Sequence, residues 1–129
     1  EFPTRISLAR LLMETGMEDD ALKVVDRLVA DDDQSVEAWY LGGWCLYITG
    51  EKMKEADNKA EGKSSWSASR RWLSQCLGLY EILEYEDERL GQHANELMDN
   101  INKELGPPPE NDEDESGDED EDEDEEMKG

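Results

Sequence analysis

Features of one helix–turn–helix unit return after 34 residues, and this recurrence constrains the fold more than any other feature of the sequence. Over residues 4–31, apolar side chains recur at intervals of three and four, which predicts two amphipathic helices joined by a turn at Gly16. Three of these positions have counterparts 34 residues later: Ala9 and Gly43, Leu12 and Leu46, Gly16 and Gly50. A chain patterned in this way is expected to fold as stacked helix pairs.

A period of 34 residues built from paired helices is typical of tetratricopeptide repeats. The repeat motif places a Trp, then Leu-Gly, then a large residue, and these places hold Trp39, Gly42, Gly43 and Leu46. Gly42 departs from the usual Leu, with Leu41 beside it as a substitute. We therefore predict an all-α fold, a tetratricopeptide-repeat solenoid of paired antiparallel helices in a right-handed superhelix. Its repeats are expected at about 2–35 and 36–83.

A polar stretch of mixed charge, residues 51–65, interrupts the second predicted repeat. We interpret it as an insertion in the turn, followed by a helix over about 66–83 with Ser64 or Ser65 as its N-cap. A last helix over about 84–105 is expected to cap the array, because Gly106 and the prolines after it end helical structure. About three units are the usual minimum for stability, so we also expect further repeats before Glu1.

The chain is strongly acidic, with a net charge of −23. Residues 107–129 carry 14 acids and one lysine, and residues 1–106 carry 22 acids and 12 bases, so both parts are negative. Phosphate binding needs Lys and Arg to release counterions, so the charge argues against direct binding to nucleic acid or to an anionic membrane. It favours a cationic partner. The alternative is that the acidity only confers solubility.

Residues 107–129 are predicted to form a disordered acidic tail, since Met127 is their only large apolar side chain. Ser116 is followed three residues later by Glu119, which makes it a candidate site for an acidophilic kinase. Residues 112–123 fit the carboxylate positions of a calcium-binding loop, but any carboxylate template fits such a sequence, and we reject that interpretation.

Enzymatic chemistry has little support in the sequence. Cys45 and Cys76 lie in apolar helical patterns without CxxC spacing, which indicates buried free thiols in a reducing compartment. His93 is the only histidine and is interpreted as a solvated helix residue. Phosphate-binding loops and nucleophile elbows are not recognised. We therefore predict a binding protein that is not an enzyme and uses no cofactor or metal.

The first helices of stacked tetratricopeptide repeats line a concave groove, and the groove positions here are aromatic and acidic. Aromatic faces attract Arg and Lys, and carboxylates add charge-assisted hydrogen bonds. The predicted partner-binding residues are Glu14, Glu37, Tyr40, Trp44, Tyr47, Tyr85, Glu88 and Glu96. Tyr40 is expected to be exposed, whereas Trp44 and Tyr47 have the alternative of packing between repeats. The remaining tryptophans are assigned to packing: Trp39, Trp66 and Trp72.

Several stretches together resemble a known family. They are Glu37-Ala-Trp-Tyr-Leu-Gly-Gly-Trp-Cys-Leu-Tyr47, the interrupted second repeat, Tyr85-Glu-Asp-Glu-Arg-Leu-Gly91, and the Pro-Pro-Pro step into an acidic tail. In these features the chain resembles the C-terminal half of the fungal assembly chaperones of ribosomal protein uL-four. The resemblance covers essentially the whole chain, and the Trp-Tyr-Leu-Gly-Gly-Trp stretch is its most specific part.

The resemblance implies a dedicated chaperone, a tetratricopeptide superhelix with an acidic C-terminal extension. Such a chaperone captures a newly made basic ribosomal protein of the large subunit and shields its long basic loop. It then accompanies this client from cytoplasm to nucleus, where large subunits assemble, and meets the nuclear import machinery through the client. Two other interpretations of the residues stay open. One is a histone-chaperone-type repeat protein, and the other is a peptide-binding scaffold with a solubilising tail.

Overall fold

The computed structural model describes residues 2–106, and all of its regular structure is helical. The helices are α1 (Phe2–Glu14), α2 (Glu18–Asp31), α3 (Val36–Glu55), α4 (Lys59–Ile82) and α5 (Glu88–Leu105). The predicted all-α class is therefore confirmed for these residues. The predicted acidic tail, with Ser116 and the rejected calcium-loop motif, lies outside the described residues.

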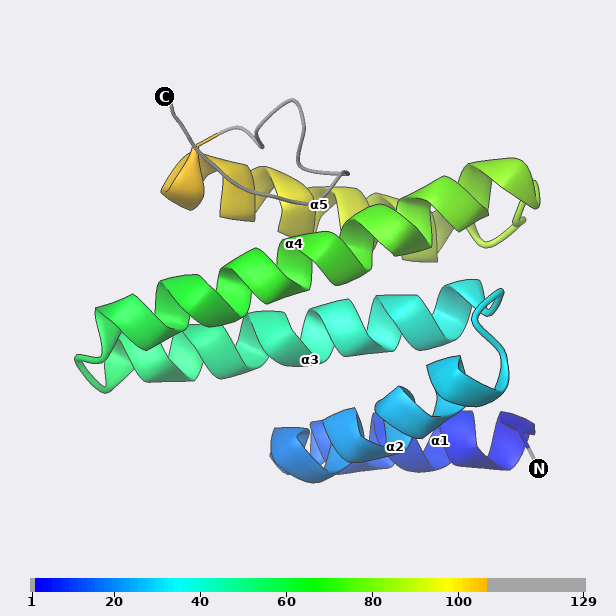
Figure 1. Ribbon diagram of the computed structural model, residues 1–129, viewed down its shortest axis with the longest axis horizontal. Coiled ribbons are helices and arrows are strands. Elements are labelled where there is room, and N and C mark those ends of the chain that lie inside the picture. The colour runs from blue at the N-terminus through cyan, green and yellow to red at the C-terminus, as the bar shows by residue number, and fades with distance from the viewer. Residues whose placement is uncertain (1, 107–129) are drawn as a thin grey trace.

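Each helix packs against the next one in the chain, and α3 and α4 form the longest pair (Figure 1). In this view α3 crosses the middle of the molecule, with the α1–α2 pair on one side of the α3–α4 pair and α5 on the other. α3 also contacts α1 and α5 directly. None of the helices in residues 2–106 combines the length and apolar character needed to cross a membrane.

The turns follow from local residue chemistry. Gly16 has φ +80°, a left-handed conformation that glycine adopts at low cost, and it separates α1 from α2 as predicted. Ser35 caps α3 by accepting a hydrogen bond from Ala38 N at 3.2 Å. Asp87 caps α5 in the same way, accepting from Leu90 N at 3.2 Å. The last helix therefore begins at Glu88 instead of the predicted Glu84.

Residues 51–65 do not form the polar turn that we expected. α3 continues to Glu55 and α4 already begins at Lys59, so the prediction of a helix starting near Trp66 is wrong. Ser65 is inside α4 and its Oγ donates to Leu46 O at 2.8 Å, so it is not an N-cap. The physical reason is close packing between the two helices. Both Gly50 and Gly62 are buried, and a side chain on Gly50 would meet the carbonyl oxygen of Gly62.

Buried apolar residues of all the described helices form one continuous core. Its centre is the α3–α4 contact, where Leu73 lies against Gly43 and the buried Ser69 Oγ donates to Gly43 O at 2.6 Å. Arg70 fastens the end of α5 to α4, since its Nη1 donates to Asn102 Oδ1 at 3.0 Å and to Gly106 O at 2.9 Å. These contacts position α5 beside the helix pair.

Both cysteines are free and buried, as predicted. Burial raises the pKa of Cys76 to about 12, and burial followed by the charges of Glu18 and Asp19 raises the pKa of Cys45 to about 12. At pH 8 only about one thiol in ten thousand is then ionised in the native protein. We expect a thiol reagent such as dithionitrobenzoate to label the native chain slowly and both thiols quickly in denaturant. Fast native labelling would contradict this burial.

Candidate partner-binding face

Side chains from α1, α3 and α5 meet on one face of the molecule, named here the α1/α3/α5 face. On one side of α3, Arg10 Nη2 lies 2.8 Å from Glu37 Oε2 and joins α1 to α3. On the other side, Tyr40 Oη lies 2.6 Å from His93 Nδ1. Farther along, Asn100 Nδ2 donates to the hydroxyl of Tyr47 at 3.0 Å. The structure thus brings predicted groove positions of α3 into one surface with residues of α1 and α5.

Tyr40 and Tyr47 form the floor of this face and are not open to a partner. Their exposed fractions are 6% and 8%, so the prediction that Tyr40 is exposed is wrong. Burial raises the pKa of Tyr40 to about 12 and also raises the pKa of Tyr47. The Tyr47 ring stacks on Trp66, with ring centroids 4.4 Å apart and an interplanar angle of 18°. Of the two interpretations of Tyr47, packing between helices is therefore the correct one.

Trp44 is half-buried and borders a small cavity of about 100 Å³. The cavity is lined by Arg10, Met13, Glu14, Trp44 and Ile48. The indole is held from the α5 side by His93, whose ring centroid lies 4.8 Å away at 86° in an edge-on arrangement. A held ring that borders an open space can still receive a side chain from outside. Of the three predicted aromatic residues of α3, Trp44 is thus the one that remains partly exposed.

The predicted carboxylates divide into two kinds. Glu37 is half-buried and already paired with Arg10. The other three are exposed, and none of them forms an ion pair with another described residue: Glu14, Glu88 and Glu96. Carboxylates of this second kind can meet a cationic partner without first breaking an internal ion pair.

Tyr85 lies between the ends of α4 and α5 and is half-buried. Burial raises its pKa, and the negative charges of Glu37 and Asp87 raise it further, whereas Arg10 lowers it. Its ring contacts that of Tyr80 on α4, with ring centroids 6.0 Å apart. The tyrosine therefore combines a partly exposed ring with nearby carboxylates in the α4–α5 turn.

His93 has a role that the sequence reasoning missed. It is half-buried, contacts Tyr40 and Trp44, and is not the solvated residue that we expected. The sequence did contain a signal for this position. His93 follows Leu90 by three residues, and residues at this spacing are neighbours on a helix surface, so the spacing placed His93 beside a core residue. Among residues 2–106, no group of three or more His, Cys, Asp or Glu side chains is arranged to hold a metal ion.

The tryptophans assigned to packing lie against the core. Trp66 is buried, and its Nε1 donates to Tyr47 O at 2.9 Å. Trp39 and Trp72 are partly buried and contact each other, with ring centroids 4.8 Å apart. The packing assignment is therefore confirmed for these three residues.

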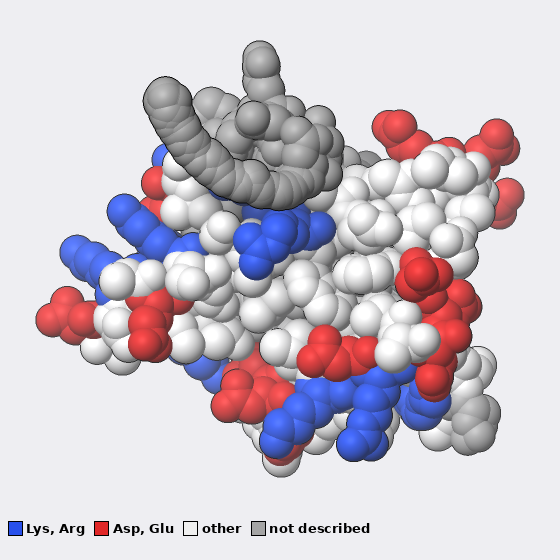
Figure 2. Space-filling view, in the orientation of Figure 1, with Lys and Arg blue, Asp and Glu red and all other residues white. Residues whose placement is uncertain are grey.

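Charge is unevenly distributed over the molecule. Figure 2 shows acidic side chains over the α2–α3 and α4–α5 turns at one end, whereas Lys and Arg lie along the α1–α2 edge and at the opposite end, with further acids among them. The two turns contain Asp32, Asp33, Glu84, Glu86 and Asp87. This acidic end adjoins Glu37, Tyr85 and Glu88. A cationic polypeptide would be steered toward it from solution.

Comparison with curated proteins supports the resemblance found in the sequence. No family model matches the chain. A protein of Emericella nidulans named "Probable assembly chaperone of rpl4" is 53% identical over 122 residues, which cover 87% of this chain and 32% of that protein. A Schizosaccharomyces pombe protein of the same name is 31% identical over 103 residues, covering 78% of this chain and 31% of that protein. The predicted resemblance is thus confirmed, and the chain spans about a third of the length of these relatives.

Proposed function

We propose that this chain is part of an assembly chaperone that holds a basic ribosomal protein of the large subunit, of the uL-four family, before its incorporation into the ribosome. The observation that carries the proposal is the 53% identity over 122 residues to a protein named as a chaperone of this kind. The proposed role is binding without catalysis. The proposed locations are the cytoplasm and the nucleus, with nuclear import machinery engaged through the client.

The proposed architecture is a tetratricopeptide-repeat solenoid in which α1–α2 and α3–α4 are successive repeats and α5 is the capping helix. Three observations support it. The helices pack in sequence, the small residue Gly43 sits where Leu73 approaches it, and the first helices of the pairs share a face with α5. In this arrangement the α1/α3/α5 face is the concave side that receives the client.

The proposed contacts on that face differ from a fully aromatic groove, because Tyr40 and Tyr47 are buried. Trp44 and its cavity would take one apolar or cationic side chain, and Glu14, Glu88 and Glu96 would face cationic residues of the client. An unassembled ribosomal protein exposes a cationic surface that binds RNA without specificity. Carboxylates on the chaperone compete for that surface by taking the place of phosphates.

A charge-reversal experiment tests this face. We expect the triple variant Glu14→Lys, Glu88→Lys and Glu96→Lys to bind the client about tenfold more weakly, since exposed ion pairs contribute about 0.5 kcal/mol each. Glu37 is left unchanged because its loss would free Arg10 and disturb the α1–α3 contact. Affinity should be measured by fluorescence anisotropy, with helical circular dichroism confirming that the variant is folded.

A matched control separates position from net charge. The control variant Asp26→Lys, Glu61→Lys and Glu81→Lys makes the same charge change at exposed sites on α2 and α4. It should keep most of the affinity at about 0.15 M salt, where charges are screened beyond about 8 Å. Equal losses in both variants, or none in either, would refute the face assignment.

The alternative functions remain distinguishable by partner. A histone-chaperone-type protein and a peptide-binding scaffold would each use an acidic groove. Affinity purification followed by mass spectrometry should recover a ribosomal protein of the large subunit if the proposal is correct. Recovery of histones would favour the first alternative, and an unchanged affinity after deletion of residues 107–129 would favour a tail that only solubilises.

A further inference from the structure

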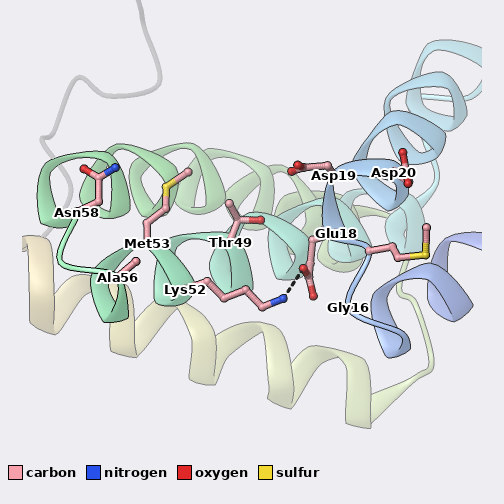
Figure 3. A pocket seen from close by; sticks show the side chains of 10 residues that line it. Gly16, Glu18, Asp19, Asp20, Thr49, Lys52, Met53, Ala56 and Asn58 are labelled. Carbon is pink, nitrogen blue, oxygen red and sulfur yellow. Dashed lines mark hydrogen bonds and ion pairs between the residues drawn. The ribbon is translucent and has the colours of Figure 1, made fainter.

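A second hollow lies apart from the α1/α3/α5 face, where the α1–α2 turn meets the far end of α3 (Figure 3). This cleft has a volume of about 450 Å³. One wall is the start of α2 from Met17 to Asp20, and the other comprises Thr49, Lys52, Met53 and Ala56. None of its lining residues belongs to the predicted groove set. The cleft therefore needs an explanation of its own.

The cleft exists because of residues 51–65, the stretch that interrupts the second predicted repeat. These residues lengthen the α3–α4 pair. As a result α3, with 20 residues, is longer than α2, which has 14. Positions 49, 52 and 53 follow helical spacing and lie on one side of α3, and Ala56 follows as its C-cap. The extended part of α3 thus forms a wall opposite the start of α2. Residues 51–65 therefore contribute to the shape of the cleft.

The walls combine apolar surface with negative charge. Met17 is 46% exposed and Met53 is half-buried, so both offer flexible apolar surface. Glu18 is buried and its Oε1 lies 2.7 Å from Lys52 Nζ, which neutralises that ammonium (Figure 3). Asp19 and Asp20 are exposed beside them, and Asp20 reaches Lys23 only at 4.0 Å. Carboxylates therefore outnumber ammonium groups in the cleft.

The acids of the first turn of α2 also complement the helix dipole, and that alone would explain their presence. Their field nevertheless extends beyond the helix end. Burial is the main cause of the raised pKa of the Cys45 thiol, and the negative charges of Glu18 and Asp19 add to it from across the α2–α3 contact. The cleft itself is lined by three carboxylates and one ammonium group, so its formal charge is negative in spite of Lys52. An anionic ligand is disfavoured there.

We propose that this cleft binds a short cationic segment of a partner polypeptide. Aliphatic stems of its side chains would lie on Met17 and Met53, and a lysine or arginine head would reach Asp19 or Asp20. The inference rests on the proposed function for the class of partner, and it adds a second contact point outside the α1/α3/α5 face. Residues 51–65 then serve client recognition by building one wall of the cleft.

Methionine methyl signals provide a site-resolved test. The full chain, labelled with ¹³C-methyl methionine, is titrated with a nine-residue oligoarginine peptide and with the corresponding neutral citrulline peptide. Met17 and Met53 report on the cleft, Met13 on the cavity beside Trp44, and Met127 on the acidic tail. We expect the arginine peptide to shift the Met17 and Met53 signals, and the citrulline peptide to leave them in place.

Charge removal in the cleft sharpens the test. In the double variant Asp19→Asn and Asp20→Asn, the shifts of Met17 and Met53 should disappear and affinity for the client should fall about three- to tenfold. The control variant Asp26→Asn and Glu81→Gln removes the same charge from exposed sites on α2 and α4 outside the cleft and should change affinity less than about twofold. Circular dichroism verifies that both variants are folded.

The outcomes separate the two proposals. If Met13 shifts while Met17 and Met53 do not, the cleft proposal is overturned and the proposed function stands. If the citrulline peptide shifts the cleft signals equally, the cleft does not select a cation and the proposal is again overturned. If neither the oligoarginine peptide nor the purified client shifts any methyl signal of residues 2–106, the cleft and the proposed function both fail.

Discussion

Replacement of Gly50 by alanine is expected to lower the free energy of unfolding by about 1–3 kcal/mol, the usual cost of overpacking a core. A Cβ at this position would overlap the indole of Trp66 and lie 2.9 Å from Gly62 O. Neither neighbour can easily withdraw, because Trp66 is buried and held by its bond to Tyr47 O, and Gly62 O belongs to a helix backbone. This cost exceeds the roughly 0.5–1 kcal/mol that alanine gains over glycine inside a helix.

Gly78 provides the matched control, since it lies in α4 and a Cβ there would have no neighbour within 4 Å. Gly78→Ala should therefore raise the free energy of unfolding by about 0.5–1 kcal/mol. The same substitution is thus expected to act with opposite signs at two helical sites. Urea unfolding followed by circular dichroism measures both values. A stabilising Gly50→Ala variant would contradict the close packing of α3 on α4.

Helix pairing could be predicted from the sequence because it depends on local patterns. Apolar residues at intervals of three and four identify the buried side of each helix, and Gly16 marks a turn that needs a positive φ. The prediction of α2 shows how well this works. Its buried residues include Ala21, Val25 and Leu28, all of which belong to the apolar pattern. Local pattern and tertiary packing agree in that part of the chain.

Residues 51–65 were assigned incorrectly because their helical structure depends on one close approach between two helices. The stretch is polar, and only Gly62 within it is buried, so it lacks an apolar stripe. Its helices are stabilised instead by the contact of Gly50 with Gly62 and by Lys54, whose Nζ lies 3.5 Å from the centre of the Trp66 ring. Sequence periodicity contains no information about such a contact.

The candidate face was predicted in part for the same reason. Helical spacing placed positions 37, 40, 44 and 47 toward one side of α3, and the structure agrees that they face α1 and α5. Spacing did not reveal which of them α5 would cover. The covering contacts, from Tyr40 to His93 and from Tyr47 to Asn100, each join residues 53 positions apart. Contacts over such a distance require the tertiary structure.

Leu73→Ala is expected to have the largest effect on stability, lowering the free energy of unfolding by about 3–4 kcal/mol. Leu73 is 0% exposed, and its side chain fills the space beside Gly43 at the centre of the α3–α4 contact. Gly43→Ala should cost about 1–2 kcal/mol on its own, because the new Cβ would lie 2.7 Å from Leu73 Cδ2. The atoms that each substitution adds or removes occupy the same space.

The double variant should therefore be less destabilised than the sum of the single variants, by about 1 kcal/mol or more. In the absence of the Leu73 side chain, the methyl group that Gly43→Ala adds no longer meets Cγ and Cδ2, and it fills part of the cavity that Leu73→Ala leaves. Gly43→Ala combined with Leu97→Ala is the control, since Leu97 is a buried residue of α5 and is not among the nearest neighbours of Gly43. That pair should be additive within about 0.5 kcal/mol. Equal additivity in both pairs would mean that Gly43 is not required for the approach of Leu73, and the small residue of the 34-residue period would then need another explanation.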